Sequence, residues 1–181
     1  SACSLPPVSI KHFLIKEIEN QTKKLALALR VKGFMNVQYA IEKDKIYVVE
    51  VNPRASRTVP FVSKAKNLPL AKIASRVMAG EKLSKFNLKS KTKDMFAVKE
   101  AVFPFNKFPN SDLLLGPEMK STGEVMGFDK NFGMAFAKSQ IAASNSLPKK
   151  GLAFISLKNS HKEEGVKLAR QLIKLNFKLC G

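Results

Sequence analysis

The chain has 181 residues, 45% of them hydrophobic, which is enough to bury a core of about one domain. Its formal net charge is +18, but most of the basic residues are lysines dispersed along the chain. No basic run with interleaved aromatic residues is present, so the composition argues against nucleic-acid binding and indicates a solvated lysine-rich surface.

The sequence also lacks the patterns of a membrane or secreted protein. No run of eighteen apolar residues occurs, and the amino terminus has no signal-peptide pattern. Cys3 and Cys180 lie near opposite ends without metal-ligand spacing, so we expect reduced thiols. We therefore predict a cytoplasmic protein with no membrane partner.

The first predicted elements are a helix and a hairpin. Ser9 is the expected N-cap of a helix that runs to about Arg30. Apolar residues then alternate along 34–41 and 46–51, which predicts two strands joined by a turn at residues 43–45.

The hairpin register predicts a polar face. If the turn centres on Asp44, Gln38 faces Glu50, and Asn52 lies on the same side because side chains alternate with period two. The opposite face is expected to pack on the core with these residues: Val37, Tyr39, Ile41, Tyr47, Val49 and Val51.

Carboxylate and amide oxygens on one face suit magnesium or manganese. Arg54 and Arg57 follow directly, and their planar forks match phosphate or carboxylate oxygens. From the spacing alone, a solvated hairpin face followed by an Asn-Pro turn is an equally open interpretation.

Further elements alternate between helix and strand, which indicates an α/β protein. The pattern predicts a helix from Pro69 to Gly80, a strand over 95–103 and a helix capped by Asn131. The glycines of the 114–127 stretch lack P-loop order, and the phenylalanines of 103–108 are expected to pack.

The carboxyl-terminal residues predict a βαβ unit. The segment NSLPKKG has the composition of a linker and places a boundary near Lys150. A buried strand over 152–157, a helix capped by Ser160 and a strand beginning at Phe177 complete the unit.

Several segments in order resemble the second synthetase half of the carbamoyl-phosphate synthetase large chain. They are VQYAIEKDKIYVVEVNPRASRTVPFVSKA, PLAKIASRVMAG, VKEAVFPFNKFP, LLGPEMKSTGEVMG and FGMAFAKSQIAA. The resemblance implies that residues 1–148 form the carboxyl-terminal portion of an ATP-grasp domain. It also implies that residues 149–181 begin a Rossmann-like, methylglyoxal-synthase-like regulatory domain.

The resemblance implies an ATP-dependent ligase that forms carbamoyl phosphate from bicarbonate, ammonia and ATP, with a glutaminase small subunit as partner. Gln38 and Glu50 would hold one Mg²⁺ or Mn²⁺ ion and contact ATP, and Glu50 and Asn52 would hold a second ion. Arg54 and Arg57 would act on phosphate or carbamate oxygens. Glu100 is a regulatory candidate, because in some members that position lies near an effector site.

Other contacts of the family's nucleotide site, including the phosphate-covering loop, have no counterpart in the sequence. The 181 residues are therefore expected to supply one wall of the site and to be inactive alone. A non-catalytic regulatory or interaction module stays open as an alternative, as does a basic nucleic-acid binder.

Overall fold

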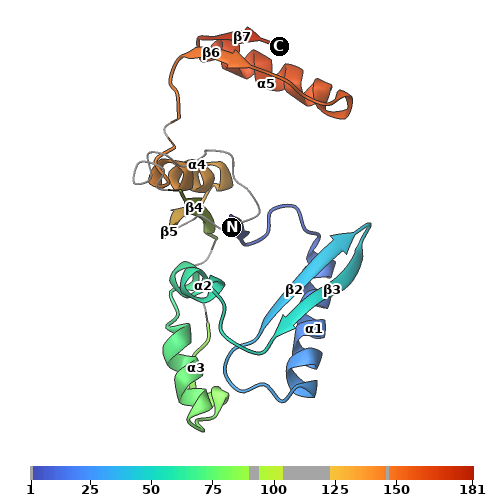
Figure 1. The fold of residues 1–181 in the computed structure, drawn as a ribbon, viewed down its shortest axis with the longest axis vertical. Helices are drawn as coiled ribbons and strands as arrows, with labels where there is room; N and C mark the ends of the chain where they lie inside the picture. The colour runs from blue at the N-terminus through green and yellow to red at the C-terminus, as the bar shows by residue number, and fades with distance from the viewer. Residues whose placement is uncertain (1, 90–93, 104–122, 146) are drawn as a thin grey trace, which may run out of the picture. The chain divides into compact units, whose positions relative to one another are not determined.

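A computed structural model describes residues 2–89, 94–103, 123–145 and 147–181 (Figure 1). The chain divides into two compact units, Ser1–Ser144 and Asn145–Gly181. Both units mix helices and strands, so the predicted α/β class is confirmed. The assignment of residues 1–148 and 149–181 to two particular domains stays a prediction.

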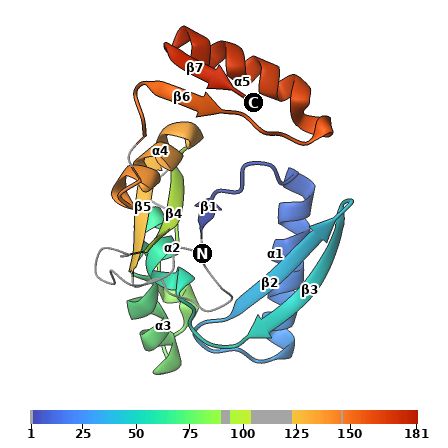
Figure 2. The ribbon, with the colours of Figure 1, turned by 45° about the horizontal axis from the view of Figure 1, so that its top comes forward.

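The first unit begins with a short strand, a long helix and a hairpin. These are β1 (Cys3–Leu5), α1 (His12–Ala28), β2 (Asn36–Glu42) and β3 (Lys45–Asn52). The predicted cap at Ser9 is wrong, because α1 is preceded by Lys11, which makes no side-chain capping bond. In Figures 1 and 2 the hairpin lies along α1.

Two helices and two strands follow the hairpin. They are α2 (Thr58–Lys66), α3 (Leu70–Met78), β4 (Phe96–Val102) and β5 (Gly123–Asp129), with a 3-10 turn, η1 (Leu83–Lys85), after α3. The helix predicted from Pro69 and the strand predicted over 95–103 are confirmed as α3 and β4. The sequence did not predict α2.

The core of this unit surrounds an antiparallel sheet in the order β1-β4-β5. Phe61 and Ala65 of α2 pack against Ala97 on one face of the sheet. The other face is covered by α4 (Phe132–Ala142), and Figure 1 shows β4 and β5 between the two helices.

The helix α4 begins where the sequence predicts. The Asn131 side chain accepts a hydrogen bond from the Met134 amide at 3.1 Å, which confirms it as the N-cap. A Cβ built at Gly127 of β5 would lie 1.9 Å from the Ala135 carbonyl oxygen. The absence of a side chain at Gly127 therefore allows α4 to lie directly on the sheet.

The second unit is a βαβ unit. Parallel strands β6 (Gly151–Phe154) and β7 (Phe177–Cys180) are connected through a 3-10 turn, η3 (Asn159–His161), and α5 (Lys162–Lys174). The predicted order of elements is confirmed, but two details are wrong. The first strand is exposed rather than buried, with Phe154 73% exposed, and Ser160 lies in η3 instead of capping α5.

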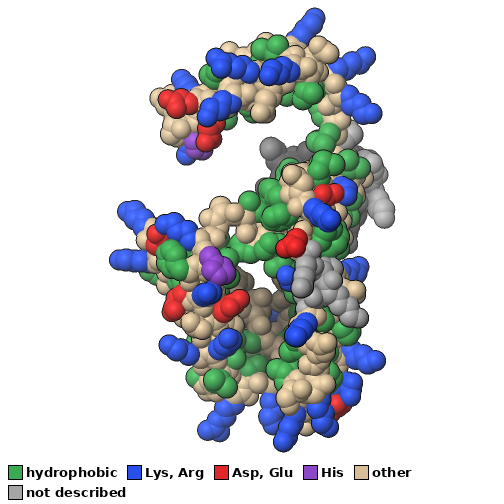
Figure 3. Space-filling view, turned by 180° about the vertical axis from the view of Figure 1, so that it is seen from behind, with side chains coloured by type: hydrophobic (Ala, Val, Ile, Leu, Met, Phe, Trp, Pro, Cys, Tyr) green, Lys and Arg blue, Asp and Glu red, His purple; other side chains and the backbone are tan. Residues whose placement is uncertain are grey.

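Basic side chains are distributed widely over the surface. Figure 3 shows lysine and arginine side chains spread over the visible face rather than gathered in one patch. Among the described residues, no helix is long and apolar enough to cross a membrane.

Candidate functional site

The hairpin brings the predicted oxygen donors together. In the antiparallel register Gln38 pairs with Glu50, as predicted, and Asn36 pairs with Asn52. Directly opposed side chains in such a pair have Cβ atoms about 4.5–5.5 Å apart. Four polar side chains therefore line one face of the ribbon at its open end.

A β-bulge determines which face Glu50 occupies. Nearer the turn Tyr39 pairs with Val48, so that Val49 is an extra residue between the pairs on either side. Simple alternation from the turn would place Glu50 on the same face as Tyr39. The bulge shifts the alternation by one residue and places Glu50 beside Gln38 instead.

The turn is shorter than predicted. Lys45 belongs to β3 and pairs with Glu42, which leaves Lys43 and Asp44 as a two-residue turn. Both turn residues have positive φ, 48° and 65°, as a type I′ turn requires.

The face of the ribbon opposite the donors also differs from prediction. Tyr47 and Val49 are predicted on the core side, but Tyr47 pairs with Ala40, two residues from Gln38 on the same face of β2, and Val49 is the bulged residue. Ile46 and Val48 take their places, opposite Ile41 and Tyr39.

Helix α1 supports the hairpin from that side. The Tyr39 hydroxyl lies 2.8 Å from Oγ1 of Thr22 in α1. At the tip, the Lys11 ammonium donates to the Asp44 carboxylate at 2.5 Å. These contacts hold the side of the hairpin that lies away from Gln38 and Glu50, so the donor face is left open.

The donor face has the chemistry of a hard-cation site. Gln38 and Glu50 are exposed, Asn52 is half-buried, and the Asn52 amide donates to the Glu50 carboxylate. One carboxylate and two amide oxygens fit Mg²⁺ or Mn²⁺, which complete their shells with water or phosphate. Within the described residues no group of three His, Cys, Asp or Glu side chains could hold a metal, and Glu50 is the one acidic side chain among the four polar side chains at the open end of the ribbon.

The two predicted arginines lie in the loop that leaves β3. The Arg54 amide donates to the Asn52 carbonyl at 2.8 Å, and its guanidinium donates to the Ala55 carbonyl at 3.0 Å. Arg57 occupies the N-cap position of α2. Both side chains are exposed. Arg54 lies two residues and Arg57 five residues after Asn52, the last residue of the donor face.

Sequence reasoning missed a connection between this loop and β2. The Ser56 hydroxyl oxygen accepts from the Asn36 amide at 3.4 Å and from the Thr58 backbone amide at 3.3 Å. Asn36 lies two residues before Gln38 and therefore on the same face of β2. This spacing is the signal that could have identified Asn36 from the sequence. The loop with Arg54 and Arg57 is thus linked to the start of the donor face.

Glu100, the regulatory candidate, lies elsewhere, on the α4 side of the sheet. Its carboxylate accepts from Gln140 of α4 at 2.8 Å and from the Ala101 amide at 3.1 Å. The stretch 104–122, which holds Gly116 and most of the predicted phenylalanine cluster, lies outside the described residues.

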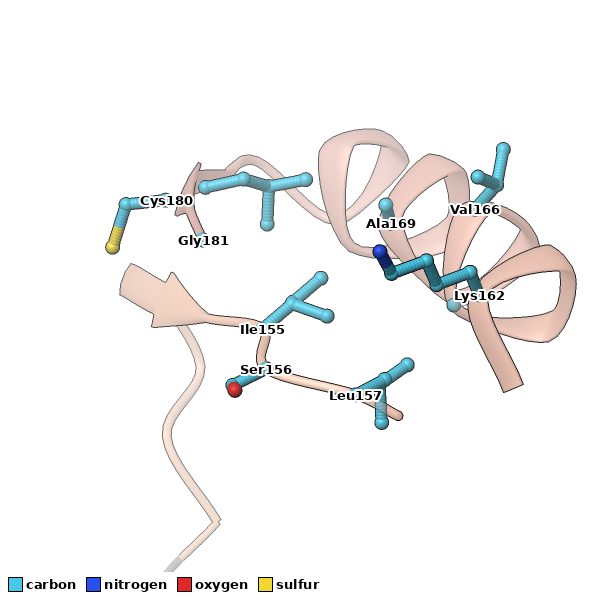
Figure 4. Close-up of a pocket in the computed structure, with 10 residues that line it drawn as sticks. Ile155, Ser156, Leu157, Lys162, Val166, Ala169, Cys180 and Gly181 are labelled. Atoms are coloured by element: carbon cyan, nitrogen blue, oxygen red, sulfur yellow. The ribbon is translucent and has the colours of Figure 1, made fainter. Parts of the chain in front are cut away.

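The second unit contains a cavity of 640 Å³ between the end of β6 and α5 (Figure 4). Its lining is largely apolar, with Lys162 as the charged group. A Cβ at Gly165 would lie 2.5 Å from Cδ1 of Leu157, so the small residue permits close packing on one side of this cavity. None of the predicted site residues lines it.

Comparisons with known proteins find related sequences. A family described as "Carbamoyl-phosphate synthase L chain, ATP binding domain" matches residues 4–86, which include the whole hairpin and arginine loop. The carbamoyl phosphate synthase large chains of Methanobrevibacter smithii and Archaeoglobus fulgidus are 54% and 55% identical over 100% of this chain.

A third relative is the "Carbamoyl phosphate synthase large chain, C-terminal section" of Aquifex aeolicus, which is 48% identical over 98% of this chain. The chain spans 17% of the length of the first two relatives and 36% of the third.

Proposed function

Because the chain belongs to the carbamoyl-phosphate synthetase large-chain family, we propose that residues 34–66 form one wall of a metal and ATP site that phosphorylates carbamate. The supporting observation is the register of the hairpin, in which Gln38 and Glu50 share one face with Asn52. Arg54 and Arg57 follow this face directly.

In this proposal the hairpin binds two divalent ions through shared oxygen donors. Gln38 and Glu50 hold one Mg²⁺ or Mn²⁺ ion, and Glu50 and Asn52 hold the other. Such ions neutralise charge on the nucleotide phosphates during phosphoryl transfer. The role of the protein is to fix the three side chains on a backbone that is anchored to α1.

Arg54 and Arg57 are proposed to stabilise phosphate or carbamate oxygens. Their guanidinium groups stay charged at neutral pH and offer planar pairs of donors. The bonds from Asn36 to Ser56 and from Thr58 to Ser56 support a defined position for this loop. Phosphoryl transfer of this kind depends on positioning and electrostatics, so a side-chain nucleophile is not required.

Gln38 and Glu50 are exposed, so we propose that this wall acts together with further protein groups. The 181 residues alone are then catalytically inactive. In the complete enzyme the nitrogen would come from a glutaminase partner and the carbon from bicarbonate. The unit Asn145–Gly181 is proposed to begin the regulatory domain.

A chimera tests the proposed function. Residues 1–181 would replace the matching segment of the Archaeoglobus fulgidus large chain, which is 55% identical over the whole of this chain. We expect the chimera to make carbamoyl phosphate and its Glu50→Gln variant to make none. A Tyr47→Phe control, at an exposed position of β3, should retain activity. Full activity of the Glu50→Gln chimera would refute the proposal.

A further inference from the structure

The first unit also contains a cavity, which lies beside α3 and away from the hairpin. It has a volume of 510 Å³, within the range of small-molecule sites. Its walls come from residues 67–69, from one side of α3 and from Phe86, Asn87 and Lys89, which follow the 3-10 turn η1. The proposed carbamate-phosphorylating site does not use any of these residues.

The cavity has an apolar floor. Ile73 of α3 is 9% exposed, and Leu68 and Phe86 are half-buried. All three line the cavity, so they offer an apolar surface next to solvent. A small planar group could bury apolar area there, which favours binding.

Three cationic side chains surround this floor: Lys72, Arg76 and Lys89. Lys72 and Arg76 are four residues apart on α3 and therefore lie on the same face of the helix. Glu81 forms an ion pair with Arg76 and so balances one of the three charges, which leaves two lysine charges beside the apolar surface.

Arg76 is held in place before any ligand binds. Its Nε donates to Oε1 of Glu81 at 2.5 Å, and its Nη2 donates to Oε2 at 2.7 Å. Its guanidinium carbon lies 4.8 Å from the centre of the Phe86 ring, in a cation-π arrangement. Nη1 has no hydrogen bond among those described, so an N–H pair stays available on a fixed guanidinium.

We propose that this cavity binds a small organic phosphate with a planar apolar body. The phosphate dianion matches Nη1 of Arg76 and the ammonium groups of Lys72 and Lys89, because charge-assisted bonds of this type are the strongest hydrogen bonds in proteins. The planar body lies on Leu68 and Ile73. This site is independent of the one proposed on the hairpin.

Calorimetric titration of the 181-residue chain with three probes tests this inference at physiological salt. Phenyl phosphate carries both parts of the ligand, inorganic phosphate only the charge, and phenol only the ring. We expect saturable binding of phenyl phosphate with a dissociation constant below about 1 mM, and at least tenfold weaker binding of the other two. Equal binding of phenyl phosphate and inorganic phosphate would overturn the role of the apolar floor.

Variants distinguish this cavity from the general positive charge of the chain. Lys72→Gln should weaken phenyl phosphate binding about tenfold, because a charge-assisted hydrogen bond is lost. Lys23→Gln removes the same charge from an exposed position on α1 and should leave binding within about twofold. Equal losses in both variants would show non-specific attraction and overturn the inference.

Arg54→Gln separates the inference from the proposed function. If phenyl phosphate binds beside α3, Arg54→Gln leaves its affinity unchanged, whatever the role of the hairpin. If Arg54→Gln abolishes binding and Lys72→Gln does not, the phosphate binds at the arginine loop and the inference is wrong. Circular dichroism of each variant checks that the fold is retained.

Discussion

Replacing Gly127 with alanine should destabilise the first unit severely. An added Cβ would lie 1.9 Å from the Ala135 carbonyl oxygen and 2.5 Å from the Ser139 amide nitrogen, both in the backbone of α4. Real Cβ atoms essentially never lie closer than 3.0 Å to such an atom, so α4 would have to move away from β5 by at least roughly 1 Å. Overpacking of this kind costs about 1–3 kcal/mol or more.

The position of Gly127 makes relief of this clash difficult. Ala135 and Ser139 are both 0% exposed, so they lie where α4 is pressed against the sheet. The clash involves backbone atoms, which cannot rotate away as a side chain can. A shift of α4 would also disturb the bond from Gln140 to Glu100.

Gly123→Ala is the matched control on the same strand. Among the described residues, a Cβ at Gly123 would meet its nearest neighbour, Cβ of Val102, at 3.9 Å, an ordinary contact. Urea unfolding followed by circular dichroism should therefore give a loss of at least about 1 kcal/mol for Gly127→Ala and less than about 0.5 kcal/mol for Gly123→Ala. Unchanged stability of Gly127→Ala would refute the close contact between α4 and β5.

Three further predictions concern packing, capping and pH. Phe61→Ala, at a side chain that is 6% exposed, should cost about 3–5 kcal/mol in urea unfolding, whereas Tyr47→Ala at 47% exposure should cost far less; similar losses would contradict the proposed core. Asn131→Ala should lower the unfolding free energy by about 0.5–2 kcal/mol through loss of the α4 cap, and Ser160→Ala, which removes no cap, should change it little; a larger effect at Ser160 would reverse the assignment. The pKa of Asp129 is lowered from 3.8, first by the hydrogen bond from the Asn131 backbone amide. The ionised carboxylate therefore stabilises the fold fully above about pH 4, and this stabilisation is lost as the pH falls through the lowered pKa. Below about pH 4 the free energy of unfolding of Asp129→Asn should depend less on pH than that of the unsubstituted protein, and an equal dependence would contradict this.

The polar face of the hairpin could be predicted from the sequence because two strong local signals agree. Alternating apolar residues defined both strands, and their spacing about the turn gave the pairing of Gln38 with Glu50. That pairing is right although the turn is one residue shorter than expected. The turn has one residue fewer than predicted and β3 has one unpaired residue more, the bulged Val49, so the pairing beyond the bulge is unchanged.

The bulge itself could not be predicted, because a β-branched residue such as Val49 fits regular strands and bulges alike. Helix α2 was missed for a similar reason. Its N-cap position is held by Arg57, which makes no capping bond, and Pro60 lies in its first turn. Packing of Phe61 and Ala65 on the sheet, a tertiary contact, stabilises this helix.

Capping was predictable only where a side chain and a backbone amide meet. The Asn131 side chain accepts from a backbone amide at the start of α4. Ser9 and Ser160 lie before the N-cap positions of α1 and α5, which are held by Lys11 and His161. The predicted burial of the strand in the second unit failed because apolar residues such as Leu152, at 65% exposure, are not covered by the described residues of that unit.

The most direct measurement of the proposed site is Mn²⁺ titration of the 181-residue chain, followed by NMR. Bound Mn²⁺ broadens signals of nearby nuclei, so even weak binding at the hairpin is detectable. We predict selective broadening at Gln38, Glu50 and Asn52, and its loss in Glu50→Gln but not in a Glu42→Gln control near the turn. Broadening centred elsewhere, or broadening that survives Glu50→Gln, would contradict the assignment of this face as the metal-binding wall.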